Sequence, residues 1–170
     1  MTTTERKLTG EHADLLETLG KHRFFLRYTV QGLTDEQAAF TPTASRLCLG
    51  GLIKHVTRAE RNWFDFIVDG PGEPAEPDLE MHLNTFRMLP GETLAGLLDE
   101  YEAVARRTDE LLASGVDLDK SWPLPEAPWF EPGASWSIRR VLLHIVAETA
   151  QHAGHADIIR ETIDGQKSMG

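Results

Sequence analysis

The chain has 170 residues, 41% of them hydrophobic, which is enough for one domain with a buried core. Its formal net charge of −10 argues against nucleic-acid binding, which requires clustered Lys and Arg. No signal peptide is recognisable, and no apolar run approaches the roughly 20 residues of a membrane-spanning helix. The single cysteine, Cys48, excludes an intramolecular disulfide framework and suits a reducing cytosol. We therefore expect one cytoplasmic domain, residues 1–170, with a disordered polar end at residues 1–8 and no nucleic-acid or membrane partner.

Four long segments carry apolar residues at helical spacing, and no segment shows the alternation of a strand. They cover residues 11–30, 48–68, 92–113 and 137–165. Ser45 is the candidate N-cap of the second segment, Thr93 lies near the cap of the third, and Thr34–Gln37 forms a capping box that predicts a short helical turn. The pattern predicts an all-α fold, a four-helix bundle whose long connections, residues 69–91 and 114–136, follow the second and third helices.

The second predicted helix carries two polar residues on or beside its apolar stripe. His55 lies beside the stripe, while Glu60 projects within it, which is unusual for a carboxylate. Glu60 could accept a hydrogen bond from a metal-ligating histidine, or it could pair with a buried arginine, and we prefer the ion pair. Gly50 and Gly51, near the start of this helix, permit close approach of backbone or ligand.

The last predicted helix, SIRRVLLHIVAETAQHAGHADIIRETIDG, places three histidines and a glutamate on its apolar face. His144, Glu148, His152 and His155 follow one another at spacings of four, four and three residues. At about 100° per residue these side chains occupy a sector roughly 80° wide, among the aliphatic residues of the same stripe. Buried polar groups need partners, and a divalent cation is the partner that we favour.

Two ligands four residues apart on one helix, with a third from a facing helix, are a common way to build a metal centre. Glu148 and His152 supply the pair, and His55 is the best candidate for the third ligand. Imidazole and carboxylate suit Zn(II), Ni(II), Co(II) or Fe(II), with zinc as the expected metal and nickel as the alternative. Three protein ligands leave an open position, as catalytic sites do. The alternative interpretation is a hydrogen-bonded His–Glu layer in the core or a pH-sensitive interface.

Two blocks of sequence carry a resemblance to a known family. LGGLIKHVTRAERNWF, Leu49–Phe64, and VLLHIVAETAQHAGHADIIRETIDG, Val141–Gly165, resemble the DinB/YfiT-like superfamily, in particular its branch related to mycothiol-dependent maleylpyruvate isomerase. The resemblance implies a four-helix bundle, often a homodimer, whose metal is held by a histidine of the second helix and a pair on the last. The usual last-helix pattern is HxxxH with a glycine two residues later, and here Glu148, His152 and Gly154 occupy these positions.

The same resemblance implies a transferase or isomerase that uses a low-molecular-weight thiol, such as mycothiol or bacillithiol, on a small electrophile. A bound cation would favour the reactive thiolate over the thiol. We expect three residues to be partners of the ligands or alternative ligands: His155, His144 and Glu60. The candidate substrate-binding residues are Arg58, Asn62, Trp129 and Arg139. The alternatives are a metal-binding stress-response protein without turnover and a structural His–Glu layer without metal.

Overall fold

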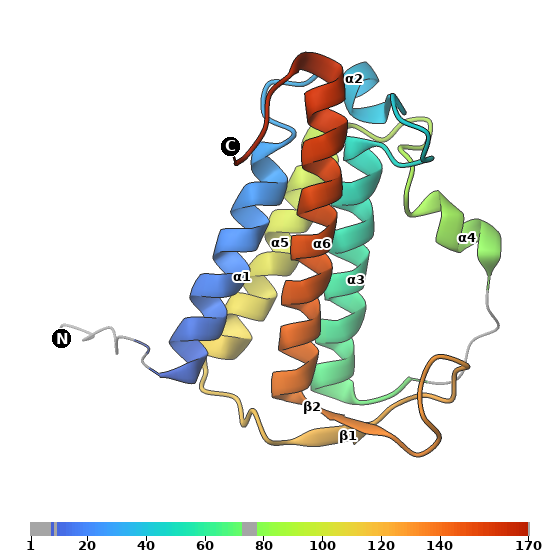
Figure 1. The fold of residues 1–170 in the computed structure, drawn as a ribbon. Helices are drawn as coiled ribbons and strands as arrows, with labels where there is room; N and C mark the ends of the chain where they lie inside the picture. Colours follow the sequence, from blue (N-terminus) through green and yellow to red (C-terminus); the bar gives the residue numbers. More distant parts are fainter. Residues whose placement is uncertain (1–7, 9, 73–77, 170) are drawn as a thin grey trace.

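The computed structural model describes residues 8, 10–72 and 78–169, and most of the predicted disordered end lies outside this range. Four long helices lie side by side and form the body of the molecule (Figure 1). They are α1 (Glu11–Tyr28), α3 (Leu49–Asp69), α5 (Leu94–Ala113) and α6 (Ile138–Asp164). The all-α prediction is confirmed, and the four segments predicted from apolar periodicity are these four helices. None of the helices within the described residues is long and apolar enough to cross a membrane.

Short elements occupy the connections between the long helices. They are α2 (Asp35–Ala39), α4 (Leu79–Asn84), β1 (Ser121–Pro123) and β2 (Ser135–Ser137). The predicted helical turn is α2, whereas α4 and the strands were not predicted. The strands pair antiparallel, with Trp122 opposite Trp136. The hairpin does not change the all-α class, and strands of three residues are too short to show an alternating pattern in the sequence.

Side chains cap the N-termini of α2 and α3. Thr34 forms the predicted capping box at the start of α2. The N-cap of α3 is Cys48 rather than the predicted Ser45, because the Gly51 amide donates to the Cys48 sulfur at 3.3 Å. Ser45 lies in the irregular chain that precedes the helix. A serine would be the commoner cap, so the sequence favoured it over a cysteine three residues later.

A polar layer divides the core of the bundle into two apolar clusters. One cluster includes Leu26, Val56, Tyr101, Ala153 and Ile159. The other includes Leu19, Phe66, Leu112, Val141 and Ile145. Between the two clusters along each helix lie buried polar side chains, namely Arg23 of α1, Glu60 of α3, and Thr149 and His152 of α6. Because unpartnered buried polar groups are costly, ion pairs or ligands are expected in this layer.

Two glycines of α3 let another segment approach the start of the helix. A Cβ on Gly51 would lie 2.0 Å from the carbonyl oxygen of Phe86, and a Cβ on Gly50 would also collide with this segment. The close approach predicted from the two glycines is therefore present, and the chain that follows α4 is what approaches. The contact places Thr85 and Phe86 beside His55, one helical turn further along α3.

Candidate metal centre

Three potential ligands from two helices converge in the polar layer. His55 comes from α3, and Glu148 and His152 lie one turn apart on α6. The Oε1 atom of Glu148 lies 3.0 Å from Nε2 of His55 and 3.3 Å from Nε2 of His152. The three potential ligand atoms all lie within 4.8 Å of one another. The fold therefore brings together the three residues named from the sequence, with both imidazole nitrogens facing the same carboxylate oxygen.

The charges and donor types of these three groups suit a divalent cation. Hydrogen bonds from His152 and His55 hold the pKa of the Glu148 carboxyl far below its usual range, so Glu148 is anionic at neutral pH. The two imidazole side chains are largely buried, with 14% of His55 and 11% of His152 exposed. Two nitrogen donors and one carboxylate oxygen match the ligands that zinc and nickel accept, and they leave further coordination positions for another ligand. The residues present therefore fit such an ion.

Two residues that the sequence analysis missed contact the His55 ring. Nδ1 of His55 lies 3.2 Å from the hydroxyl oxygen of Thr85. The Phe86 ring stacks on the imidazole, with ring centroids 3.9 Å apart and an interplanar angle of 20°. Both residues belong to the connection after α3, which shows no long periodic pattern. The pair Gly50–Gly51 was the one signal that some segment approaches this part of α3.

The other two histidines of α6 have different surroundings. Nδ1 of His155 lies 3.3 Å from Nδ1 of His152, so His155 contacts a candidate ligand. His144 instead meets Trp63 and Trp136, with ring centroids 5.0 and 5.3 Å away. Burial lowers the pKa of His144 and so favours its neutral form. His144 belongs to an aromatic cluster, and the group of described residues that could hold a metal ion does not include it.

Glu60 belongs to a separate ion-pair network. Nε of Arg23 donates to Oε2 of Glu60 at 3.2 Å, and Nη2 of the same arginine donates to Oε1. Nη1 of Arg23 also donates to Asp109 at 2.7 Å. Arg23 and Glu60 are only 4% and 1% exposed. The ion-pair interpretation of Glu60 therefore holds, and both of its carboxylate oxygens are engaged by arginine rather than by a ligand histidine.

Two of the four candidate substrate-binding residues line a groove near the three potential ligands. A cavity of about 640 Å³ lies among α3, α4 and α5, and Arg58 and Asn62 form part of its wall. Nη2 of Arg58 donates to the sulfur of Met81 on α4 at 3.0 Å. Thr85, whose hydroxyl contacts His55, lines the same cavity. The groove therefore reaches the residue that lies behind the His55 ring.

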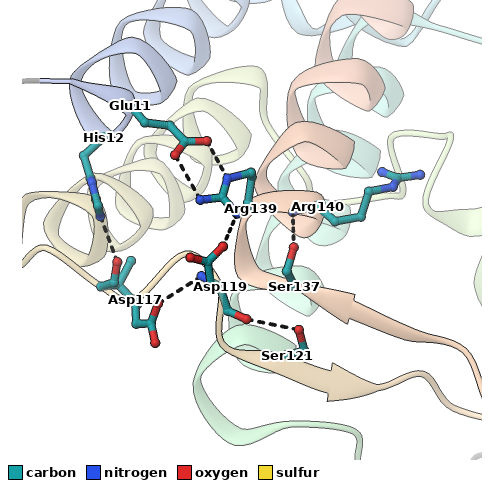
Figure 2. A network of polar contacts seen from close by, with 9 residues as sticks. Glu11, His12, Asp117, Asp119, Ser121, Ser137, Arg139 and Arg140 are labelled. Atoms are coloured by element: carbon teal, nitrogen blue, oxygen red, sulfur yellow. Dashed lines mark hydrogen bonds and ion pairs between the residues drawn. The ribbon is translucent and has the colours of Figure 1, made fainter.

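The other two candidate substrate-binding residues lie elsewhere. Nε and Nη2 of Arg139 donate to the two carboxylate oxygens of Glu11 at 2.5 and 3.0 Å, and Nη1 donates to Asp119 (Figure 2). The guanidinium thus joins the first turns of α1 and α6 to the chain before β1. Trp129 is 74% exposed, and its ring contacts Phe130. The contacts of these two residues include none of the three potential ligands, and their part in substrate binding stays a prediction.

Known proteins share both the fold and the sequence pattern of this chain. The crystal structure of a conserved protein from Enterococcus faecalis has a TM-score of 0.71 at 14% sequence identity, over 94% of this chain and 100% of that chain, and so shares its fold. No curated protein matches the chain in sequence. A sequence profile described as mycothiol-S-transferase matches residues 14–165, a span that contains His55, Glu148 and His152. The chain therefore belongs to the mycothiol-S-transferase family, which is of the DinB/YfiT-like type.

Proposed function

We propose that the protein is a divalent-metal-dependent S-transferase that joins a low-molecular-weight thiol, such as mycothiol, to a small electrophile. Membership of the mycothiol-S-transferase family supports a thiol co-substrate and thiol transfer as the coarse activity. The convergence of His55, Glu148 and His152 is the observation that carries the metal-dependent part of the proposal. A thiol-dependent isomerase is the nearest alternative, since it needs the same sulfur nucleophile.

The three converging residues have distinct roles in this proposal. His55, Glu148 and His152 would hold the ion, with zinc as the first candidate and nickel as the second. When bound, the ion supplies a positive charge that favours the nucleophilic thiolate over the thiol. Glu148 lowers the net charge of the centre, and the two imidazoles, anchored on different helices, set its geometry. The thiol proton leaves to solvent, one sulfur–carbon bond forms, and the leaving group takes the electrons of the bond that breaks.

Two spaces beside the candidate metal centre differ in polarity. Mainly apolar side chains of α3 and α6 line a narrow space against Glu148. Such side chains exclude water, which strengthens the electrostatic interactions within the site. By contrast, the groove beside α4, which reaches Thr85, is lined by Arg58 and Asn62, whose side chains are hydrogen-bond donors. We therefore assign the polar part of the thiol to this groove.

Elemental analysis of the untagged protein tests the metal site. The wild type should carry a stoichiometric transition metal, and His55→Ala and His152→Ala should each lose it. His12→Ala is the matched control, because Nε2 of His12 bonds the Val116 carbonyl at 2.8 Å and His12 is outside the candidate metal group. Stoichiometric metal in both ligand variants would reject the proposed site.

A screen of low-molecular-weight thiols against model electrophiles then tests the reaction. Product should form only with both the thiol and the metal present, and the His152→Ala variant should lose turnover. Metal without turnover for any thiol would instead support a metal-binding protein that does not act as an enzyme. A wild type that binds no metal would support the purely structural His–Glu layer.

We also propose a cytoplasmic homodimer. A reduced thiol co-substrate fits the reducing cytoplasm. The outer face of α6 exposes two large apolar side chains, Leu143 at 49% and Ile158 at 60%, and a second copy of the chain could cover them. Light scattering with size-exclusion chromatography measures the oligomeric state, and a monomer at micromolar concentration would reject the dimer.

A further inference from the structure

We propose that Thr85 is a positioning residue, which accepts a hydrogen bond from Nδ1 of His55 and so makes Nε2 the nitrogen that coordinates the metal. The inference rests on the proposed metal site and deepens it, since it names a residue that determines how well one ligand is prepared. Thr85 is 4% exposed and lies at the C-terminal end of α4. Nothing about its position in the sequence suggests a role at a site formed by α3 and α6.

The hydrogen bonds of Thr85 determine which atom carries the proton. The Thr85 hydroxyl has one hydrogen, and it donates this hydrogen to the carbonyl oxygen of His82 at 2.7 Å. That carbonyl lies in the last turn of α4 and also accepts a hydrogen bond from the backbone N–H of Thr85 at 3.1 Å. The hydroxyl oxygen can then only accept from Nδ1 of His55, 3.2 Å away. Nδ1 must therefore carry a hydrogen, and a neutral His55 has its lone pair on Nε2.

Nε2 of His55 faces the carboxylate beside which a cation would bind. Nε2 of His55 lies 3.0 Å from Oε1 of Glu148, and His152 presents its own Nε2 to the same oxygen. A hydrogen on Nε2 of His55 would occupy the space that the cation needs. Thr85 therefore keeps a hydrogen on Nδ1, so that a cation would replace the hydrogen at Nε2, as the outer partners of metal-ligating histidines commonly arrange.

The Thr85 hydroxyl can do this because the backbone that carries it is held firmly against α3. The Phe86 carbonyl oxygen accepts a hydrogen bond from the Cys48 thiol at 3.7 Å and lies where a Cβ of Gly51 would be. The Phe86 ring covers one face of the imidazole at 3.9 Å between centroids. Phe86 thus restricts the tilt of the His55 ring, and Thr85 holds its Nδ1 atom.

Two substitutions of Thr85 separate its hydroxyl from its shape. Thr85→Val is nearly isosteric and removes the hydroxyl, whereas Thr85→Ser keeps it. Thr108→Val is the matched control, because Thr108 is also a buried threonine whose hydroxyl donates to a backbone carbonyl within its own helix. Loss of an outer hydrogen-bond partner weakens metal binding by about 10–100-fold, so Thr85→Val should weaken zinc binding by this factor in a competition titration with a chelating dye. Thr85→Ser and Thr108→Val should bind zinc as the wild type does.

A second measurement follows the proton itself and does not require metal. In ¹⁵N–¹H spectra of the zinc-free protein, the Nδ1–H signal of His55 should be protected from solvent exchange. The signal is assigned from its loss in His55→Ala, and it should also disappear in Thr85→Val but not in Thr85→Ser. Wild-type zinc affinity in Thr85→Val, or a protected Nδ1–H that survives in this variant, would overturn the inference. A wild type that binds no zinc would instead reject the proposed function, while the spectra alone would still decide the hydrogen bond.

Discussion

The buried pair Arg23–Glu60 offers a prediction whose size follows directly from the structure. Glu60→Gln keeps the shape of the side chain but removes its charge from a site that is 1% exposed. Arg23 then keeps its bond to Asp109 and one bond to the amide oxygen, but it loses the negative charge of Glu60 and the second accepting oxygen. Removing one partner of a buried ion pair costs about 3–5 kcal/mol, because the other charge is left without compensation.

Urea unfolding followed by circular dichroism measures this loss. In a chain of this length, about 3 kcal/mol corresponds to a fall in melting temperature of at least about 6 °C. The matched control is Glu100→Gln, because Glu100 pairs with Arg61 at the surface, where the two side chains are 47% and 36% exposed. An exposed pair contributes less than about 1 kcal/mol, so this variant should unfold almost as the wild type does.

Replacing both partners of the buried pair should have a much smaller effect. Arg23→Met combined with Glu60→Met removes both buried charges, so the double variant should recover most of the stability that Glu60→Gln loses. If Glu60→Gln lowers the stability as little as Glu100→Gln does, burial does not make the Arg23–Glu60 pair matter more than the exposed pair.

Three further predictions concern packing, pH and metal. Gly51→Ala should lower the free energy of unfolding by about 1–3 kcal/mol, because its Cβ would lie 2.0 Å from the Phe86 carbonyl oxygen. Gly154→Ala has open space around its Cβ and should raise the free energy of unfolding in the same urea assay. Hydrogen bonds from Arg160 lower the pKa of Asp164. The pair therefore stabilises the folded protein at pH values above the usual carboxyl pKa, and this stabilisation is lost as the pH falls through the lowered pKa of Asp164. Between about pH 5 and pH 3 the wild type should therefore lose more stability than Asp164→Asn does, and equal losses would contradict the sign. Zinc at about 100 times its Kd should stabilise the wild type by about 2.7 kcal/mol, with reversal by a chelator, and an unchanged melting curve would count against the metal site.

The success and failure of the sequence predictions follow from the range of the interactions involved. The four long helices and the alignment of Glu148 with His152 depend on spacings of three and four residues, which the sequence displays directly. The choice of an ion pair for Glu60 was correct, because a carboxylate within an apolar stripe needs a buried partner. The partner itself, Arg23, lies 37 residues away and could not be named from periodicity.

The residues that the sequence could not place in the fold share one feature. Arg139 and Trp129 were chosen for their chemistry, yet Arg139 is held by Glu11 at one end of the bundle and Trp129 projects into solvent. Thr85 was overlooked because the connection that contains it has no long periodic pattern. In each case the deciding contact joins different elements of the fold.

The sequence by itself therefore determined where the four long helices lie and which side chains share one face of α6, since both follow from the geometry of a single helix. Only the tertiary structure decided that His55 meets Glu148, 93 residues later, and that Thr85 lies behind the imidazole. The physical reason is that packing of α3 against α6, and of the segment after α4 against Gly51, determines these contacts. Such packing depends on the shape of the whole core rather than on any local spacing.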